Sequence, residues 1–224
     1  MLKHLPNALT LLRLVLAPVI AWLFWLAATP LAGSYTLFPD ADTYAHALAG
    51  YRAQSAYALA AATLFAIAAL TDLFDGMAAR AFDADSKFGR LIDPIADKAL
   101  VGLPLIAASA AMWGGHTSAW PVVAIATAII VIRDIGMTVY RMTSPDGEGV
   151  RVSSLAKWKT ALELVVVAAL LVIVAVVTNR RALGLDTTLP QFIPVGWVIL
   201  LVLTAGLSVF TAIQYGNARK RVAP

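Results

Sequence analysis

Two things are scarce in this sequence: it contains no cysteine, and only 13% of its 224 residues are charged. Without cysteine, neither a disulfide framework nor a thiolate metal site can form. A soluble globular chain usually has about a quarter charged residues, and no polar segment here is long enough to build a soluble domain. With 60% hydrophobic residues and a mean hydropathy of +0.80, the composition is typical of an integral membrane protein.

Positive charge is present in only modest excess. Seventeen basic and thirteen acidic residues give a net charge of +4, but no basic patch is interleaved with aromatic residues as single-strand binding requires. We therefore expect no nucleic-acid partner, and we interpret the basic residues as markers of cytoplasmic loops. The first apolar segment, residues 8–28, is too long for a secretory signal peptide, so we expect it to be a membrane span.

Apolar segments of spanning length occur six times. A helix needs roughly 20 mostly apolar residues to cross the hydrocarbon core, and six segments satisfy this: 8–28, 55–80, 90–112, 120–141, 158–178 and 192–214. The predicted fold is an all-α integral membrane bundle, with six transmembrane helices around a polar cavity open to the cytoplasmic side. Residues 29–54 are expected to form a long outer loop, for which the sequence indicates no role.

Basic residues also predict the orientation. With a cytoplasmic N-terminus, fourteen basic residues fall on the inner side and three on the outer side. The positive-inside rule therefore predicts a multi-pass protein of the plasma membrane with both termini in the cytoplasm. The outer three are Arg52 and the neighbouring pair Arg180 and Arg181. This pair is the one feature that the rule does not explain.

Four aspartates stand near the inner edge of the second and third spans. Asp72 and Asp75 are three residues apart, and Asp93 and Asp97 are four apart, so each pair shares a helix face. The second span reaches the inner surface and the third returns from it, so the pairs can converge. Four carboxylates at low dielectric repel strongly, and one or two divalent cations remove that repulsion. Mg²⁺ and Mn²⁺ prefer such oxygen ligands, so a metal site is predicted here.

The residues between the two pairs suit a phosphate-bearing ligand. Gly76, Ala79 and Gly89 keep the helix faces beside the aspartates shallow, which leaves room for a bulky ligand, although tight helix packing explains such residues equally well. Arg80 can supply a fork of donors to phosphate oxygens. The acidic pairs and these residues therefore favour a site for a metal-bound phosphate.

The pattern Asp72-x2-Asp75-Gly76-x2-Ala79-Arg80-x8-Gly89-x3-Asp93-x3-Asp97 resembles the signature of the CDP-alcohol phosphotransferases. All eight fixed residues agree over the 26 positions, and the six-span layout also fits that family. The resemblance implies a single domain of this family over residues 1–224. It also implies an enzyme that transfers a substituted phosphate group from a CDP-linked lipid to an alcohol and releases CMP. Two Mg²⁺ or Mn²⁺ ions and a homodimer are implied as well.

The same resemblance assigns roles to the signature residues. Asp72, Asp75 and Asp93 would bind the metal pair. Asp97 would complete the metal site and act as the catalytic base that takes the proton from the acceptor hydroxyl. The metals would neutralise the diphosphate and stabilise the departing CMP. The implied CDP-binding residues are Asp72, Gly76, Ala79, Arg80 and Gly89.

The acceptor must be sought outside the signature. Three further segments resemble the members of the family that transfer the phosphatidyl group of CDP-diacylglycerol to glycerol 3-phosphate: LPNALTLLRLVLAP, DPIADKAL, and the stretch from IRDIGMTVYR to LAKWKTALE. A phosphorylated acceptor needs cations in addition to those that hold CDP. The expected acceptor-phosphate residues, all at the inner ends of spans four and five, are Arg133, Arg141, Lys157 and Lys159.

Arg133 is the most informative of these cations because it lies within an apolar segment. An arginine in a membrane span normally faces a partner or a polar cavity, and the adjacent Asp134 is expected to point elsewhere on the helix. Snorkelling to the interface is the alternative interpretation. For Lys157 and Lys159, the alternative is ordinary flanking of a span by positive charge.

Three alternatives stay open, the first of them within the same family. A cardiolipin synthase of the CDP-diacylglycerol type would use phosphatidylglycerol as the acceptor. A Mg²⁺-dependent membrane prenyltransferase also handles a diphosphate with aspartate clusters, but usually places them on well-separated helices. A transporter or channel would hold its acidic ion site near the bilayer midplane, whereas these aspartates stand at one end of their spans.

Overall fold

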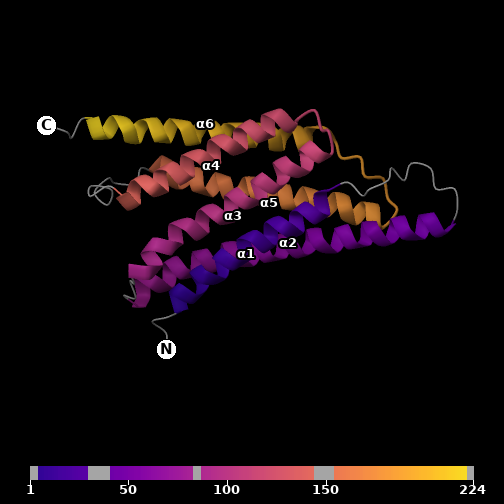
Figure 1. Ribbon diagram of the computed structural model, residues 1–224, viewed down its shortest axis with the longest axis horizontal. Helices are drawn as coiled ribbons and strands as arrows, with labels where there is room; N and C mark the ends of the chain where they lie inside the picture. The colour runs from indigo at the N-terminus through magenta and orange to yellow at the C-terminus, as the bar shows by residue number, and fades with distance from the viewer. Residues whose placement is uncertain (1–4, 30–40, 83–86, 144–153, 221–224) are drawn as a thin grey trace.

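All regular secondary structure in the described part of this computed structural model is helical (Figure 1). The backbone is described for residues 5–29, 41–82, 87–143 and 154–220, and the side chains for 7–29, 45–71, 92–140, 155 and 158–215. Six helices follow one another: α1 (Leu5–Ala28), α2 (Ala41–Phe82), α3 (Lys87–Gly114), α4 (Trp120–Thr143), α5 (Ser154–Ala182) and α6 (Phe192–Lys220). Each contains a segment long and apolar enough to cross a membrane, so the predicted six-helix membrane fold is confirmed.

Helix α2 is longer than the sequence predicted. It begins at Ala41, so the prediction of a loop over residues 29–54 is wrong for 41–54, while residues 30–40 lie outside the described part. Polar residues lower the hydropathy of 41–54, but alanine is frequent there and has the highest helix propensity. At about 1.5 Å per residue, its 42 residues extend about 63 Å, and α2 projects past its neighbours at the right of Figure 1. The other five helices extend past the predicted spans by only a few residues.

Successive helices run in opposite directions through the bundle (Figure 1). Helix α1 packs against α2 and α3, and α6 packs against α4 and α5. Contacts of α2 with α5 and of α3 with α4 join these two layers. The start of α1 and the end of α6 consequently lie at the same end of the bundle. We call this end, which also holds Asp93 and Asp97, the signature end, and the opposite end, which holds Thr29, Gly115 and Arg181, the far end.

The core is apolar and mostly aliphatic, and all six helices contribute to it. Representative core residues, one from each helix in order, are Ile20, Phe65, Leu105, Ile130, Val166 and Leu201. Large aliphatic side chains are also exposed on the outer faces, including Val15 at 62%, Ile132 at 70% and Leu203 at 64% exposure. Helices that are apolar on all sides are typical of membrane spans. The outer faces are therefore suited to contact with lipid.

Helix α5 ends in a Schellman motif. Gly184 adopts a φ of 69°, a left-handed conformation that glycine tolerates best. The amide of Leu185 donates to the Arg180 carbonyl at 2.9 Å, and the amide of Gly184 donates to the Arg181 carbonyl at 3.1 Å, which is the pair of hydrogen bonds that defines this cap. The cap holds the backbone of the two arginines at the far end.

Candidate functional site

Asp93 and Asp97 lie one turn apart on α3 and both contact α1. Nη1 of Arg13 donates to Oδ1 of Asp97 at 2.5 Å, and Nη2 of Arg13 lies 3.6 Å from Oδ1 of Asp93. The hydroxyl of Thr10 also donates to Oδ1 of Asp93. The side chains of Asp93 and Asp97 are 44% and 40% exposed, whereas that of Arg13 is only 2% exposed. The two carboxylates therefore stand at an accessible edge of the α1–α3 contact, with an arginine behind them.

The partners on α1 follow from helical spacing. Thr10 and Arg13 are three residues apart, so they share a face, and both are buried. Sequence analysis included them in a segment that resembles the family but assigned them no contact. Arg13 satisfies the criterion that was applied to Arg133, since it is a charge inside an apolar span that must face a partner. That criterion identifies the residue, but only the packing of α1 on α3 identifies its partners.

The chemistry of this carboxylate pair fits a hard divalent cation. The guanidinium of Arg13 lies beside both Oδ1 atoms, and positive charge of this kind offsets the repulsion between two carboxylates one turn apart. Carboxylate oxygens are the ligands that Mg²⁺ and Mn²⁺ prefer. Within the part of the chain that the structure describes, however, no three acidic or histidine side chains form a group that could hold a metal. The side chains of Asp72 and Asp75 lie outside that part, so the four-carboxylate site stays a prediction.

The implied CDP-binding residues lie on the two helices that flank α1. Asp72, Gly76, Ala79 and Arg80 belong to α2, and Gly89 belongs to α3. Both helices pack against α1. The side chains of these residues lie outside the described part of the chain, so their role in binding CDP also stays a prediction.

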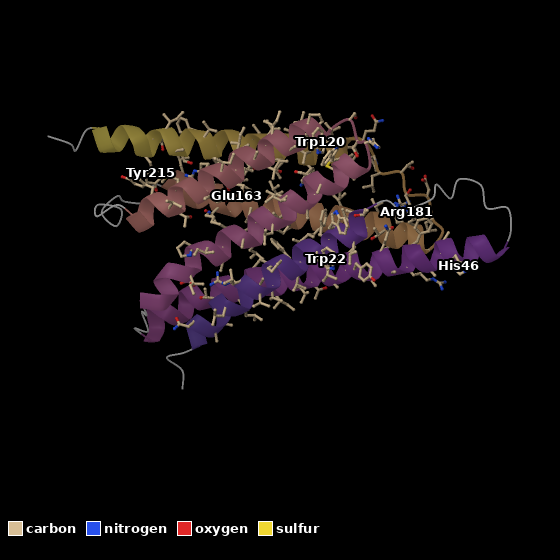
Figure 2. The ribbon with its side chains drawn as sticks, in the orientation of Figure 1. Trp22, His46, Trp120, Glu163, Arg181 and Tyr215 are labelled. Atoms are coloured by element: carbon tan, nitrogen blue, oxygen red, sulfur yellow. The ribbon has the colours of Figure 1, made fainter. Side chains whose placement is uncertain are left out.

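A second group of charges lies inside the bundle, close to the carboxylate pair. Lys159 contacts Asp134 of α4 and also Glu163 of its own helix, where the Nζ–Oε1 distance is 2.6 Å. Nζ of Lys98 lies 3.0 Å from Oδ2 of Asp134 and 3.8 Å from Oε2 of Glu163. Glu163, labelled in the interior of the bundle in Figure 2, is 0% exposed, and Lys159 is 1% exposed. Together with Arg133, these four residues are called the buried ion cluster below.

Arg133 extends the buried ion cluster toward α6. Its Nη1 donates to Oδ1 of Asp134 at 2.9 Å, and its Nη2 donates to the Thr211 hydroxyl at 2.9 Å. Arg133 therefore faces partners, as expected for an arginine in a span. The expectation that Asp134 points elsewhere is wrong, because the long arginine side chain reaches back to the residue beside it. Arg141 and Lys157 belong to α4 and α5, but their side chains lie outside the described part of the chain.

Positive charge exceeds negative charge in the buried ion cluster. Its three cations, Lys98, Arg133 and Lys159, face two anions, Asp134 and Glu163. Because an uncompensated buried charge is costly, the cluster is suited to receive an additional anion. Lys98 is its most accessible member, with 25% of the side chain exposed. It borders, together with Asp134, a cavity of about 380 Å³ between α3 and α4.

The carboxylate pair and the buried ion cluster meet on a single turn of α3. Asp97 and Lys98 are consecutive residues, yet Asp97 pairs with α1 and Lys98 with α4 and α5. Sequence analysis did not assign Lys98, Asp134 or Glu163 to the site. The sequence feature that could have identified them is that each is a charged residue within an apolar helix, and charged residues inside membrane spans usually have a function.

A comparison with protein families matches residues 3–203 to the CDP-alcohol phosphatidyltransferases. This chain belongs to that family. The match covers most of the chain, so the resemblance that the signature suggested is confirmed. Dependence on a divalent metal is general in the CDP-alcohol phosphatidyltransferase family, in agreement with the chemistry of the Asp93–Asp97 pair.

The names of curated relatives state the donor and the acceptor, or the lipid product. The chain is 32% identical to the CDP-diacylglycerol–glycerol-3-phosphate 3-phosphatidyltransferase of Cereibacter sphaeroides, over 74% of this chain and 62% of the relative. It is 35% identical to a probable phosphatidylglycerophosphate synthase of Mycobacterium tuberculosis, over 63% of this chain and 53% of the relative. It is 28% identical to a protein of Pseudomonas fluorescens with the same name as the first, over 96% and 89%. The chain thus spans less than two thirds of the length of the first two relatives.

Proposed function

We propose that this chain transfers a phosphatidyl group from CDP-diacylglycerol to glycerol 3-phosphate, releasing CMP and forming phosphatidylglycerophosphate. Family membership supports the reaction class, and the names of the relatives support the acceptor. The observation that carries the proposal is the shared turn of α3, where Asp97 belongs to the carboxylate pair and Lys98 to the buried ion cluster. A metal-bound donor and an anionic acceptor can meet at such a turn.

The carboxylates have two roles in this proposal. Asp72, Asp75, Asp93 and Asp97 would hold a pair of Mg²⁺ or Mn²⁺ ions, which would supply positive charge to the diphosphate of the donor and to the departing CMP. Asp97 also accepts the proton of the acceptor hydroxyl. The hydroxyl oxygen then forms the new bond to phosphorus, while the bond between phosphorus and the CMP oxygen breaks.

Neighbouring residues position the carboxylates and the donor. Arg13 and Thr10 orient Asp97 and Asp93 through their ion pair and hydrogen bond. The CDP moiety lies against α2 and the start of α3, where its contacts are Asp72, Gly76, Ala79, Arg80 and Gly89.

The buried ion cluster supplies the binding energy for the acceptor phosphate. Lys98 is its most exposed cation, so it is the first to meet the phosphate, and Arg133 adds a planar fork suited to phosphate oxygens. Lys159 lies deeper in the bundle and positions Lys98 indirectly, because Asp134 and Glu163 form ion pairs with both lysines. The set of acceptor-phosphate residues is Lys98, Arg133, Arg141, Lys157 and Lys159.

The charge distribution supports an orientation for this reaction. The helix ends at the signature end have many basic residues, among them Arg80, Lys87, Arg141 and Arg219, whereas the far end has Arg52, Arg180 and Arg181. By the positive-inside rule, the signature end, both termini and a polar cavity there face the cytoplasm, where glycerol 3-phosphate is dissolved. The chain is then a multi-pass protein of the plasma membrane, and the resemblance to the family implies that it acts as a homodimer.

An acceptor assay tests the proposal. The purified protein is given CDP-diacylglycerol with Mg²⁺ or Mn²⁺ and either glycerol 3-phosphate or phosphatidylglycerol, and CMP release and the lipid product are measured. We expect release with glycerol 3-phosphate. Release with phosphatidylglycerol alone would instead identify a cardiolipin synthase and refute the proposed acceptor.

Asp97→Asn tests the catalytic base in the same assay. The loss of a general base lowers kcat by roughly 10²–10⁴-fold, so we expect a drop of at least about a hundredfold. Asp186→Asn is the matched control, because Asp186 is an exposed aspartate in the loop after α5, and it should keep full activity. Full activity of Asp97→Asn would exclude the proposed role.

A further inference from the structure

A cavity of about 450 Å³ lies at the far end of the bundle, between α1, α3, α5 and α6. Its size falls within the range of roughly 300–1,000 Å³ that small-ligand sites occupy. Apolar side chains from all four helices form its walls, among them Phe24, Ala111, Val174 and Trp197. Arg181 is the only charged residue among the described side chains that line it. The cavity therefore offers a hydrocarbon environment with one cation.

Three polar side chains in the walls are already hydrogen-bonded within the protein. The hydroxyl of Thr29, directly after α1, donates to the Trp25 carbonyl at 2.5 Å, and that of Thr178 donates to the Val174 carbonyl of α5 at 2.8 Å. The indole nitrogen of Trp197 donates to the Val166 carbonyl at 2.9 Å. These groups gain little from a polar ligand, so the interior favours an apolar one.

Arg181 and its neighbour Arg180 have different surroundings. The guanidinium of Arg181 lies over the ring of Tyr51, with Cζ 5.5 Å from the ring centroid, and this cation–π contact holds it against α2; Figure 2 shows Arg181 at the end of α5. Hydrogen bonds from Thr188 lower the pKa of Asp186, and the positive charge of Arg180 adds to this effect. The positive charges of both arginines interact favourably with the negative, C-terminal end of the α5 dipole. Only Arg181, however, lines the cavity.

Exposed tryptophans mark the membrane level of the far end. Trp22 is 59% exposed and Trp113 is 65% exposed. The ring of Trp113 stacks on that of Trp120 with centroids 5.9 Å apart across the turn that joins α3 to α4. Exposed tryptophans gather at the headgroup level of a bilayer. The end of α5, and with it Arg181, therefore lies near lipid phosphates.

We propose that the far-end cavity binds one acyl chain of an anionic phospholipid, whose phosphate pairs with Arg181. The apolar interior excludes a wholly polar ligand, and the guanidinium selects a negatively charged group. Because the site lies near the headgroup level of the bilayer, a phospholipid of the surrounding leaflet can supply both the acyl chain and the phosphate. This inference concerns a site at the opposite end from Asp93 and Asp97. It also gives Arg181 a role that the positive-inside rule leaves unexplained.

Native mass spectrometry of the purified full-length chain tests this site. Phosphatidylglycerol, which is anionic, and phosphatidylcholine, which is zwitterionic, are titrated separately onto the wild-type protein and its variants. Arg181→Gln removes the cation from the cavity, and Arg52→Gln removes an exposed cation of α2 that does not line it. Ala28→Leu fills part of the cavity, and Ala111→Leu, from the facing helix, replaces that variant if it does not fold.

We expect the wild type and Arg52→Gln to bind phosphatidylglycerol more tightly than phosphatidylcholine. Arg181→Gln should weaken phosphatidylglycerol binding at least about fivefold, which corresponds to one cation near an anionic lipid surface, and the filled cavity should weaken binding of both lipids. Equal losses in Arg181→Gln and Arg52→Gln would show that general surface charge is responsible and overturn the proposal. So would unchanged binding in the cavity-filling variants, or equal wild-type affinity for the two lipids. None of these measurements depends on catalysis. A negative result would therefore leave the proposed function intact, and a negative acceptor assay would leave the proposed lipid site intact.

Discussion

Replacement of Glu163 by glutamine tests the buried ion cluster. Glu163 is fully buried, and its two oxygens lie 2.6 Å from Nζ of Lys159 and 3.8 Å from Nζ of Lys98. Glu163→Gln keeps the shape of the side chain but removes its charge, so the cluster changes from three cations and two anions to three cations and one anion. Its net charge therefore rises from +1 to +2 in a site where four of the five side chains are at most 13% exposed.

The expected cost follows from this uncompensated charge. Removing one partner of a buried ion pair destabilises a protein by about 3–5 kcal/mol, and we take the lower limit because the polar amide of glutamine would still face the ammonium of Lys159. For a chain of this size, each kcal/mol lowers Tm by about 2–4 °C, so Glu163→Gln should melt about 6–12 °C below the wild type.

Thermal unfolding in one detergent, followed by tryptophan fluorescence, measures this change. The control Asp186→Asn removes an exposed carboxylate and should melt with the wild type. The double variant Glu163→Gln/Lys159→Met restores the net charge of +1, so it should be more stable than the sum of the single changes predicts, by about 0.5–3 kcal/mol. A Glu163→Gln variant that melts with the wild type, or strictly additive losses in the double variant, would refute the reasoning.

Three further changes have defined outcomes. Gly184→Ala places a side chain at a φ of 69° and should lower the free energy of unfolding by about 1–2 kcal/mol. Gly206 lies within α6, where an added Cβ meets nothing within 4 Å, so Gly206→Ala should raise the free energy of unfolding by up to about 1 kcal/mol. The same thermal melts measure both, and a loss in both variants would contradict the argument. Thr10→Val removes the hydroxyl that donates to Asp93 but keeps the branched shape, so CMP release should fall about tenfold, roughly the cost of one hydrogen bond to a charged group; an unchanged rate would show that this bond does not orient Asp93. Chelation by EDTA should abolish CMP release and added Mg²⁺ or Mn²⁺ should restore it, and activity that persists after exhaustive chelation would exclude the proposed metal pair.

Local properties of the sequence were sufficient to predict the six spans and the shared helix face of Asp93 and Asp97. Span length depends on a run of apolar residues, and a shared face depends only on spacings of three or four residues. Asp93 and Asp97 consequently lie one turn apart on α3, as their spacing indicates. The start of α2 was missed because hydropathy detects the part of a helix inside the membrane, whereas residues 41–54 form a helix of lower hydropathy that continues it.

Contacts between helices could not be predicted in the same way. When every face of a helix is apolar, its periodicity does not indicate which face packs inward, so the pairing of Arg13 with Asp97, 84 residues away, depends on how α1 and α3 are rotated against each other. The same is true of Lys159, which contacts Asp134 from 25 residues away, and of the division of roles between Arg180 and Arg181.

The sequence by itself thus determined the membrane class, the number of spans and the family, because these depend on composition and on spacing along one helix. Only the tertiary structure decided which charges meet. It pairs Asp97 with α1, joins its neighbour Lys98 to α4 and α5, and encloses Arg181 in the wall of an apolar cavity. The physical reason is that a buried charge must find its partner across a helix interface, and the geometry of that interface is a property of the packed bundle rather than of any one segment.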